Sequence, residues 1–164
     1  MMTPVTPTPP VRDVAVAGVR RRLRAATFGL LVGLLIQFLA GMLVNLFVTI
    51  PTSHPGASPA EYFGGSVQSV IWALGQRGLP GLVVHTGWGL VLVVGGLALA
   101  VRARKARRRG VTVAAVLGFL FMLGAGFNGA SFLDFHEDAS SMIMATLFAL
   151  AVLCYAAMLV LLAE

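Results

Sequence analysis

Four long apolar stretches alternate with short polar or basic segments along this chain of 164 residues. They run from about Ala25 to Ile50, from Pro80 to Val101, from about Val111 to Gly129 and from about His136 to Ala163. Each stretch has roughly the 20 residues that an α-helix needs to cross the hydrocarbon core of a bilayer. The pattern predicts an all-α membrane protein that is built as a bundle of four transmembrane helices.

The loop between the first two stretches, residues 51–79, contains a weaker helical pattern. Ser58 and Glu61 have the spacing of a capping box, and Pro59 would occupy the first helical position. Apolar residues then recur at helical spacing. We therefore expect a short amphipathic helix over 58–75 that lies along the outer membrane surface, as a lid over the bundle.

Basic residues flank the spans on one side only. Of the twelve Lys and Arg residues, all except Arg77 precede the first span or fall in the segment 102–109. Because such residues are retained in the cytoplasm, both termini are expected there, in a cell membrane of the bacterial plasma-membrane type. We expect residues 1–18 to form a disordered cytoplasmic tail and residues 19–164 to form the four-helix transmembrane domain.

Composition agrees with a membrane location and excludes several functions. Hydrophobic residues make up 58% of the chain and charged residues 11%, so the lipid bilayer is the expected partner. The net charge of +6 comes from residues beside the spans, which predicts contact with anionic lipid headgroups and no nucleic-acid partner. Cys154 is the single cysteine, so a disulfide within the chain is excluded. The sequence also shows no nucleophile with a base and no paired intramembrane carboxylates, which argues against a hydrolase or a proton pump.

Small and polar residues recur at every fourth position of the first span. These positions are Gly29, Gly33, Gln37, Gly41 and Asn45. Glycines at this spacing allow two helix backbones to approach closely. Gln37 needs a polar partner inside the membrane, which is either another helix or a bound ligand.

The later part of the third span is also crowded with small residues. It contains Gly118, Gly124, Gly126, Asn128 and Gly129. This part of the helix is expected to allow close approach of another helix or of a flat ligand.

Two histidines fall near the outer ends of the second and fourth spans. His85 is followed one helical turn later by Gly89, and His136 is followed by Ser140. Alternate helices of a four-helix bundle face each other across the core, so the two imidazoles could face one another. Two histidines with small residues one turn away are the arrangement that bis-histidine haem ligation needs.

Other interpretations of His136 stay open. It could be a loop histidine beside an acidic helix start, where Asp134 or Asp138 caps the helix. It could also join His54, Glu137 and Asp138 in an outer site for a transition metal such as zinc or copper, although their spacing matches no standard motif.

Several of these positions together resemble one half of haem A synthase, a family in which each four-helix half carries histidines on its second and fourth spans. The residues that carry the resemblance are Gln37, Gly41, His85, Gly124, Gly126 and His136. Small bacterial four-helix cytochromes b are similar. The resemblance implies haem b ligated by His85 and His136, and electron transfer at the outer face with a redox partner. Gln37, Gly41, Gly89, Asn128 and Ser140 are the further residues expected beside the cofactor.

The glycine-rich positions also support a different class of function. Small-residue surfaces pack helices of separate polypeptides as well as helices of one chain. The chain could therefore be a non-catalytic accessory subunit of a larger membrane complex, or it could form a homo-oligomer.

Overall fold

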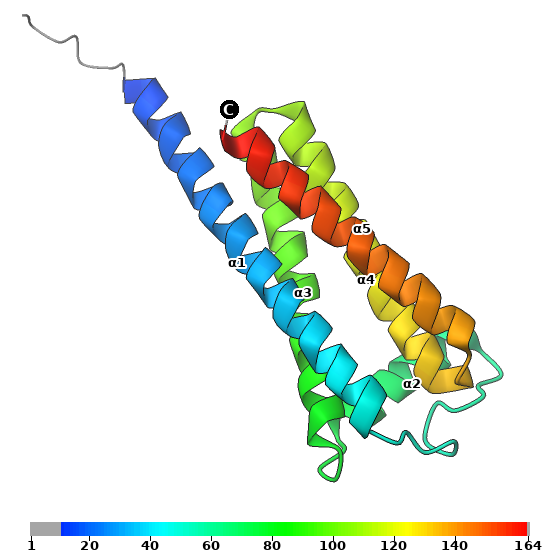
Figure 1. The fold of residues 1–164 in the computed structure, drawn as a ribbon. Coiled ribbons are helices and arrows are strands. Elements are labelled where there is room, and N and C mark those ends of the chain that lie inside the picture. Colours follow the sequence, from blue (N-terminus) through cyan, green and yellow to red (C-terminus); the bar gives the residue numbers. More distant parts are fainter. Residues whose placement is uncertain (1–10, 164) are drawn as a thin grey trace, which may run out of the picture.

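The computed structural model describes residues 11–163, with side chains from residue 16 onward. Within this range the chain is helical and contains no strand (Figure 1). The elements are α1 (Val11–Phe47), α2 (Tyr62–Leu74), α3 (Pro80–Ala103), the short 3-10 helix η1 (Arg104–Ala106), α4 (Arg109–Phe135) and α5 (Asp138–Ala163). The predicted all-α fold is confirmed.

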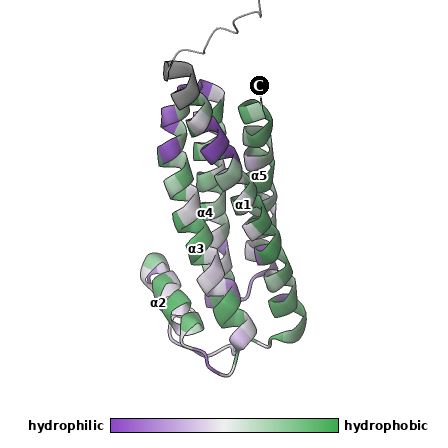
Figure 2. Ribbon diagram, turned by 90° about the vertical axis from the view of Figure 1, so that its left-hand side faces the viewer, coloured by the Kyte–Doolittle hydropathy of each residue, from purple (hydrophilic) through white to green (hydrophobic). Residues whose placement is uncertain are grey.

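The four long helices form an up-and-down bundle. α1 packs against α3 and α5, and α4 packs against the same two helices, so α1 and α4 lie on one diagonal and α3 and α5 on the other. All four are long and apolar enough to cross a membrane, which indicates a multi-pass membrane protein. Hydrophilic residues gather where α1 begins and α3 turns into α4, and α5 ends there too (Figure 2). We call this end of the bundle the basic end.

A tyrosine fills the centre of the bundle. Tyr155 on α5 is fully buried, and it belongs to the main apolar cluster with residues of all four long helices. Its ring lies against Gly118 of α4, where an added Cβ would come within 2.8 Å of a ring carbon. Gly96 of α3 leaves room for the phenol oxygen. Glycines on two helices thus admit one large side chain from the third.

The expected loop helix is present as α2, which packs between α3 and α4 at the other end of the bundle. We call this the α2 end. The predicted capping box is wrong, because α2 begins at Tyr62 and the side chain of Glu61 caps it by accepting from the backbone of Phe63 and Gly64. Ser58 instead donates its backbone N–H to the carbonyl of Asp134, 2.8 Å away. That bond ties Ser58 to α4 and keeps it out of the helix start.

Two other boundaries differ from the sequence prediction. α4 continues past Gly129 to Phe135, and His136 ends it in the left-handed conformation with φ of 55°. His136 therefore closes the third span and does not open the fourth, because a left-handed residue commonly terminates a helix. α1 begins at Val11, inside the expected tail, and the first ten residues of that tail lie outside the described residues.

Candidate functional site

The predicted site residues of the first two spans come together near the α2 end. The amide nitrogen of Gln37 on α1 donates to the backbone carbonyl of His85 on α3 at 3.1 Å. The same nitrogen lies 3.4 Å from Nε2 of His85. The amide nitrogen of Gln37 thus has its polar partner on another helix of the chain. Of the two partners considered for Gln37, another helix or a bound ligand, the structure shows the first.

Each of these polar side chains lies over a glycine of the facing helix. A Cβ added at Gly41 would be 2.9 Å from Cε1 of His85, and a Cβ added at Gly89 would be 3.0 Å from Nε2 of Gln37. The contact is reciprocal, with His85 over Gly41 and Gln37 over Gly89. The space that these glycines would give to a macrocycle is therefore filled by the chain's own side chains.

Trp88 extends the same contact by one turn towards the middle of the bundle. Its indole Nε1 donates to the carbonyl of Gly33 at 2.9 Å. Gly33 also receives the side chain of Leu92, which would meet an added Cβ at 2.6 Å. The glycine stripe of α1 is thus used for packing against α3.

The predicted site residues of the last two spans make different contacts. Nε2 of His136 is buried without a hydrogen-bond partner, and its ring centroid lies 6.4 Å from that of His54. Ser140 pairs with Ser131 of α4 at 3.2 Å. Asn128 donates to the carbonyl of Gly124, one turn back on its own helix, at 2.9 Å.

The structure does not bring His85 and His136 together. Leu82 and Leu133 belong to one apolar cluster near the α2 end. His85 has its contacts with Gln37 and Gly41 of α1, whereas the ring neighbours of His136 are His54 and Phe132. α2 also packs against both helices that carry them. The two histidines thus belong to separate sets of contacts, and haem ligation by both residues stays a prediction.

Polar contacts instead fasten α2 and the preceding loop onto the end of α4. Ser66 of α2 donates to a carboxylate oxygen of Asp134 at 2.8 Å, and both residues are buried. The ring of His54 stacks on Trp72 with centroids 4.1 Å apart, and its Nε2 lies 3.0 Å from the carbonyl oxygen of Leu133. These contacts, together with the Ser58 bond, act as a clamp that holds α2 between α3 and α4.

The expected transition-metal site is not assembled in the described part of the chain. Among residues whose side chains are described, no group of three or more His, Cys, Asp or Glu is placed to hold a metal ion. Glu137 and Asp138 are exposed, whereas His54 is engaged in the clamp.

Comparisons of the chain with protein-family models, curated proteins and solved structures found no match. Trp88 is the important residue that sequence reasoning missed, and Asp134 was expected only as a possible helix cap, whereas it accepts a hydrogen bond from Ser66. Trp88 lies three residues after His85, and this spacing places both on one helix face. Asp134 carries no such signal, because its partner Ser66 is remote in sequence.

The clamp predicts different effects for two serines of the same helix. Ser66→Ala leaves the buried Asp134 carboxylate without its donor, which should cost about 1–3 kcal/mol. Ser69→Ala is the matched control, because Oγ of Ser69 is buried without a hydrogen-bond partner. We expect hydrogen exchange at the backbone amides of α2 to become at least about fivefold faster in Ser66→Ala only. Equal acceleration in both variants would contradict the clamp.

Proposed function

We propose that this chain is a non-catalytic accessory subunit of a larger membrane assembly. The observation that supports it is that polar side chains within the apolar spans contact the neighbouring helix of the same chain. Gln37 and Trp88 donate hydrogen bonds to backbone carbonyls of that helix, and His85 packs over Gly41. Hydrogen bonds and packing contacts of this kind stabilise a bundle.

The surface that offers close approach to a partner helix lies on α4. Gly126 is exposed, and nothing in the described chain lies within 4 Å of the position of a Cβ added there. Glycine at a lipid-facing position permits tight contact between helices of separate polypeptides. The partner in this proposal is a second membrane subunit that packs at Gly126.

The proposal places the protein in a bacterial plasma membrane, with both termini in the cytoplasm and α2 along the outer surface. The basic end supports this orientation, because Lys and Arg residues are retained on the cytoplasmic side. α2 carries exposed apolar side chains at Phe63, Val67 and Ile71, as expected of a helix at the interface.

Cysteine labelling in whole cells tests the orientation. In a Cys154→Ala background, Lys105→Cys at the basic end should react only after the membrane is made permeable. Thr52→Cys, in the loop before α2, should react with an impermeant reagent from outside. The reverse pattern would overturn the orientation.

One observation favours a second candidate, a haem b protein that passes single electrons at the outer face. Nδ1 of His85 and Nε2 of His136 are both buried without a hydrogen-bond partner. Haem would supply one-electron redox chemistry. This candidate requires the two imidazoles, which belong to separate sets of contacts, to come together on one iron.

The absorption spectrum and composition of freshly purified protein separate the two candidates. After expression with ample haem and extraction in mild detergent, the accessory subunit should lack a Soret band and should carry a second polypeptide in fixed stoichiometry. Gly126→Leu should release that polypeptide. Ala156→Leu, at an exposed position of α5, is the matched control and should retain it.

A sharp Soret band that is lost in His85→Ala and in His136→Ala, and kept in His54→Ala, would overturn the accessory role in favour of haem. Colourless protein without a stoichiometric partner would contradict both candidates.

A further inference from the structure

A groove of about 290 Å³ lies between α1 and α3, on the half of the bundle nearer the basic end. Its lining includes Ala26 and Gly29 of α1 and Gly95 and Ala98 of α3. Trp88 lines the groove nearest the middle of the bundle, and Arg102 lines it at the basic end. The groove adjoins the contact between Gln37 and His85 only at Trp88 and Leu92, and Asp134 lies at the other end of the bundle.

The groove results from small residues on the facing sides of α1 and α3. α1 and α3 approach closely at Gly33, where Leu92 and Trp88 fill the contact. Towards the basic end α1 stays against the bundle, because Leu23 and Thr27 are buried there and α1 contacts η1. Four of the lining residues are small, and nothing lies within 4 Å of a Cβ added at Gly29, whereas Leu30 would lie 3.5 Å from a Cβ added at Gly95. The small side chains therefore leave part of the space between the two helices open.

The position of the groove matches one leaflet of a bilayer. Half of the hydrocarbon core is about 15 Å, or about ten residues of helix, which is the distance from Arg102 to Leu92. Exposed apolar side chains such as Val91 and Val94 border this part of α3. An acyl chain could thus lie along the groove while its headgroup stays at the level of Arg102.

Charge at the mouth of the groove identifies the headgroup. Arg102 is exposed, and every Asp and Glu whose side chain is described belongs to the α2 end of the bundle. A phosphate would therefore meet a cation that has no described carboxylate nearby. Basic pockets between transmembrane helices on the cytoplasmic side are typical binding sites for anionic lipids.

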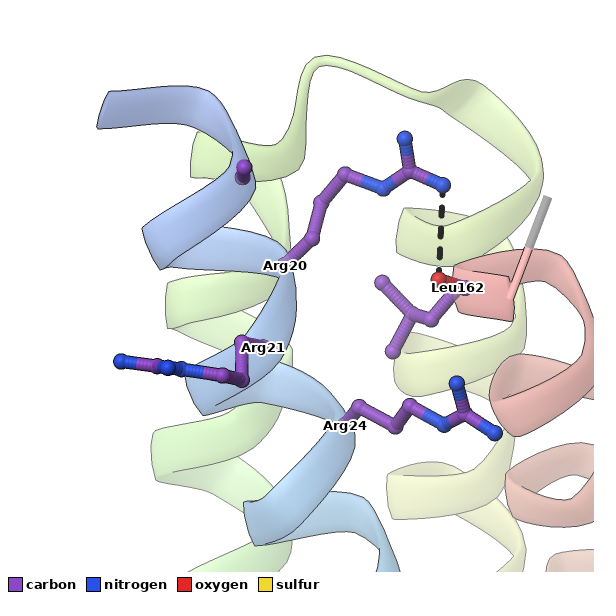
Figure 3. Close-up of a pocket in the computed structure, with 5 residues that line it drawn as sticks. Arg20, Arg21, Arg24 and Leu162 are labelled. Carbon is purple, nitrogen blue, oxygen red and sulfur yellow. Dashed lines mark hydrogen bonds between the residues drawn. The ribbon is translucent and has the colours of Figure 1, made fainter. Parts of the chain in front are cut away.

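Within the described part of the chain, two other arginines at the basic end, Arg20 and Arg108, make hydrogen bonds that Arg102 does not make. Arg20 and Arg24 extend towards the end of α5 (Figure 3), and Arg20 donates to the carbonyl of Leu162 at 3.4 Å. Arg108 donates to the carbonyl of Leu161 at 2.9 Å. Arg20 and Arg108 therefore satisfy carbonyls that have no partner in the last turn of α5.

We propose that the groove between α1 and α3 binds one acyl chain of an anionic phospholipid, whose phosphate contacts Arg102. A helix from a second copy in the same orientation would bring its own basic end against Arg102, which disfavours that occupant. The proposal does not depend on the accessory or haem function.

Native mass spectrometry of delipidated protein tests the proposal. The protein is titrated in detergent with phosphatidylglycerol and with phosphatidylcholine of the same acyl chains. The first phosphatidylglycerol should bind about fivefold more tightly, the effect of one arginine near the headgroup. Arg102→Gln should abolish this preference. Gly29→Leu and Gly95→Leu should fill the groove and weaken binding of both lipids.

Two variants serve as matched controls and should behave as the wild type. Arg109→Gln removes an exposed charge of α4 at the same end, and Ala156→Leu enlarges an exposed residue of α5. Far-ultraviolet circular dichroism checks that each variant is folded. Equal binding of the two lipids by the wild type, or unchanged binding by a folded Gly29→Leu or Gly95→Leu variant, would overturn the proposal. A dimer that Gly29→Leu converts to monomer without changing lipid binding would show a second copy in the groove.

Discussion

The constraint on which the structure depends is that polar groups inside the apolar bundle must hydrogen-bond to one another, because little water reaches them. Burying a polar side chain within an apolar span costs several kcal/mol of stability unless another polar group hydrogen-bonds to it. The amide nitrogen of Gln37 meets this need at the carbonyl of His85, whereas its Oε1 is buried without a partner among the described residues. The side chains of Gln37 and His85 lie over Gly89 and Gly41. Close approach of the backbones and the polar contact therefore depend on each other, because any larger residue at either glycine would separate the partners.

The rest of the bundle is arranged around this contact between α1 and α3. Towards the basic end, Tyr155 joins α3, α4 and α5 through glycines, and the arginines Arg20 and Arg108 fasten the end of α5. Towards the other end, α2 packs between α3 and α4 and is held there by Asp134 and His54. The histidines at that end consequently belong to two separate sets of contacts.

The features that could be predicted from the sequence are those that depend on local periodicity. Apolar runs and basic flanks predicted four spans, and the spacing from Gly33 to Gly41 predicted a close helix contact, since both signals lie within one helix. The pairing of His85 with His136 was inferred from their similar place in two spans. That inference stays untested as a haem site, and the position of His136 within the third span could not be foreseen because α4 extends beyond its apolar run.

The N-terminal cap of α2 shows a second limit of prediction from the sequence. Ser58 has the local spacing of a cap, yet a bond to the remote Asp134 carbonyl determines its conformation. Sequence patterns report contacts within a few residues, whereas the candidate site is made of contacts between helices. Gln37 illustrates this, because its need for a partner was evident and the identity of that partner required the fold.

The most direct test of the central contact is a double-mutant cycle between Gln37 and Gly89, measured as the free energy of unfolding in mixed detergent micelles. Gly89→Ala should destabilise the wild type by about 1 kcal/mol, because the new Cβ would meet the Gln37 amide at 3.0 Å. In a Gln37→Ala background the same change should be neutral or stabilising by up to about 1 kcal/mol, since alanine favours helix over glycine. Equal effects of Gly89→Ala in the two backgrounds would show that Gly89 does not serve the Gln37 contact, and would contradict this account.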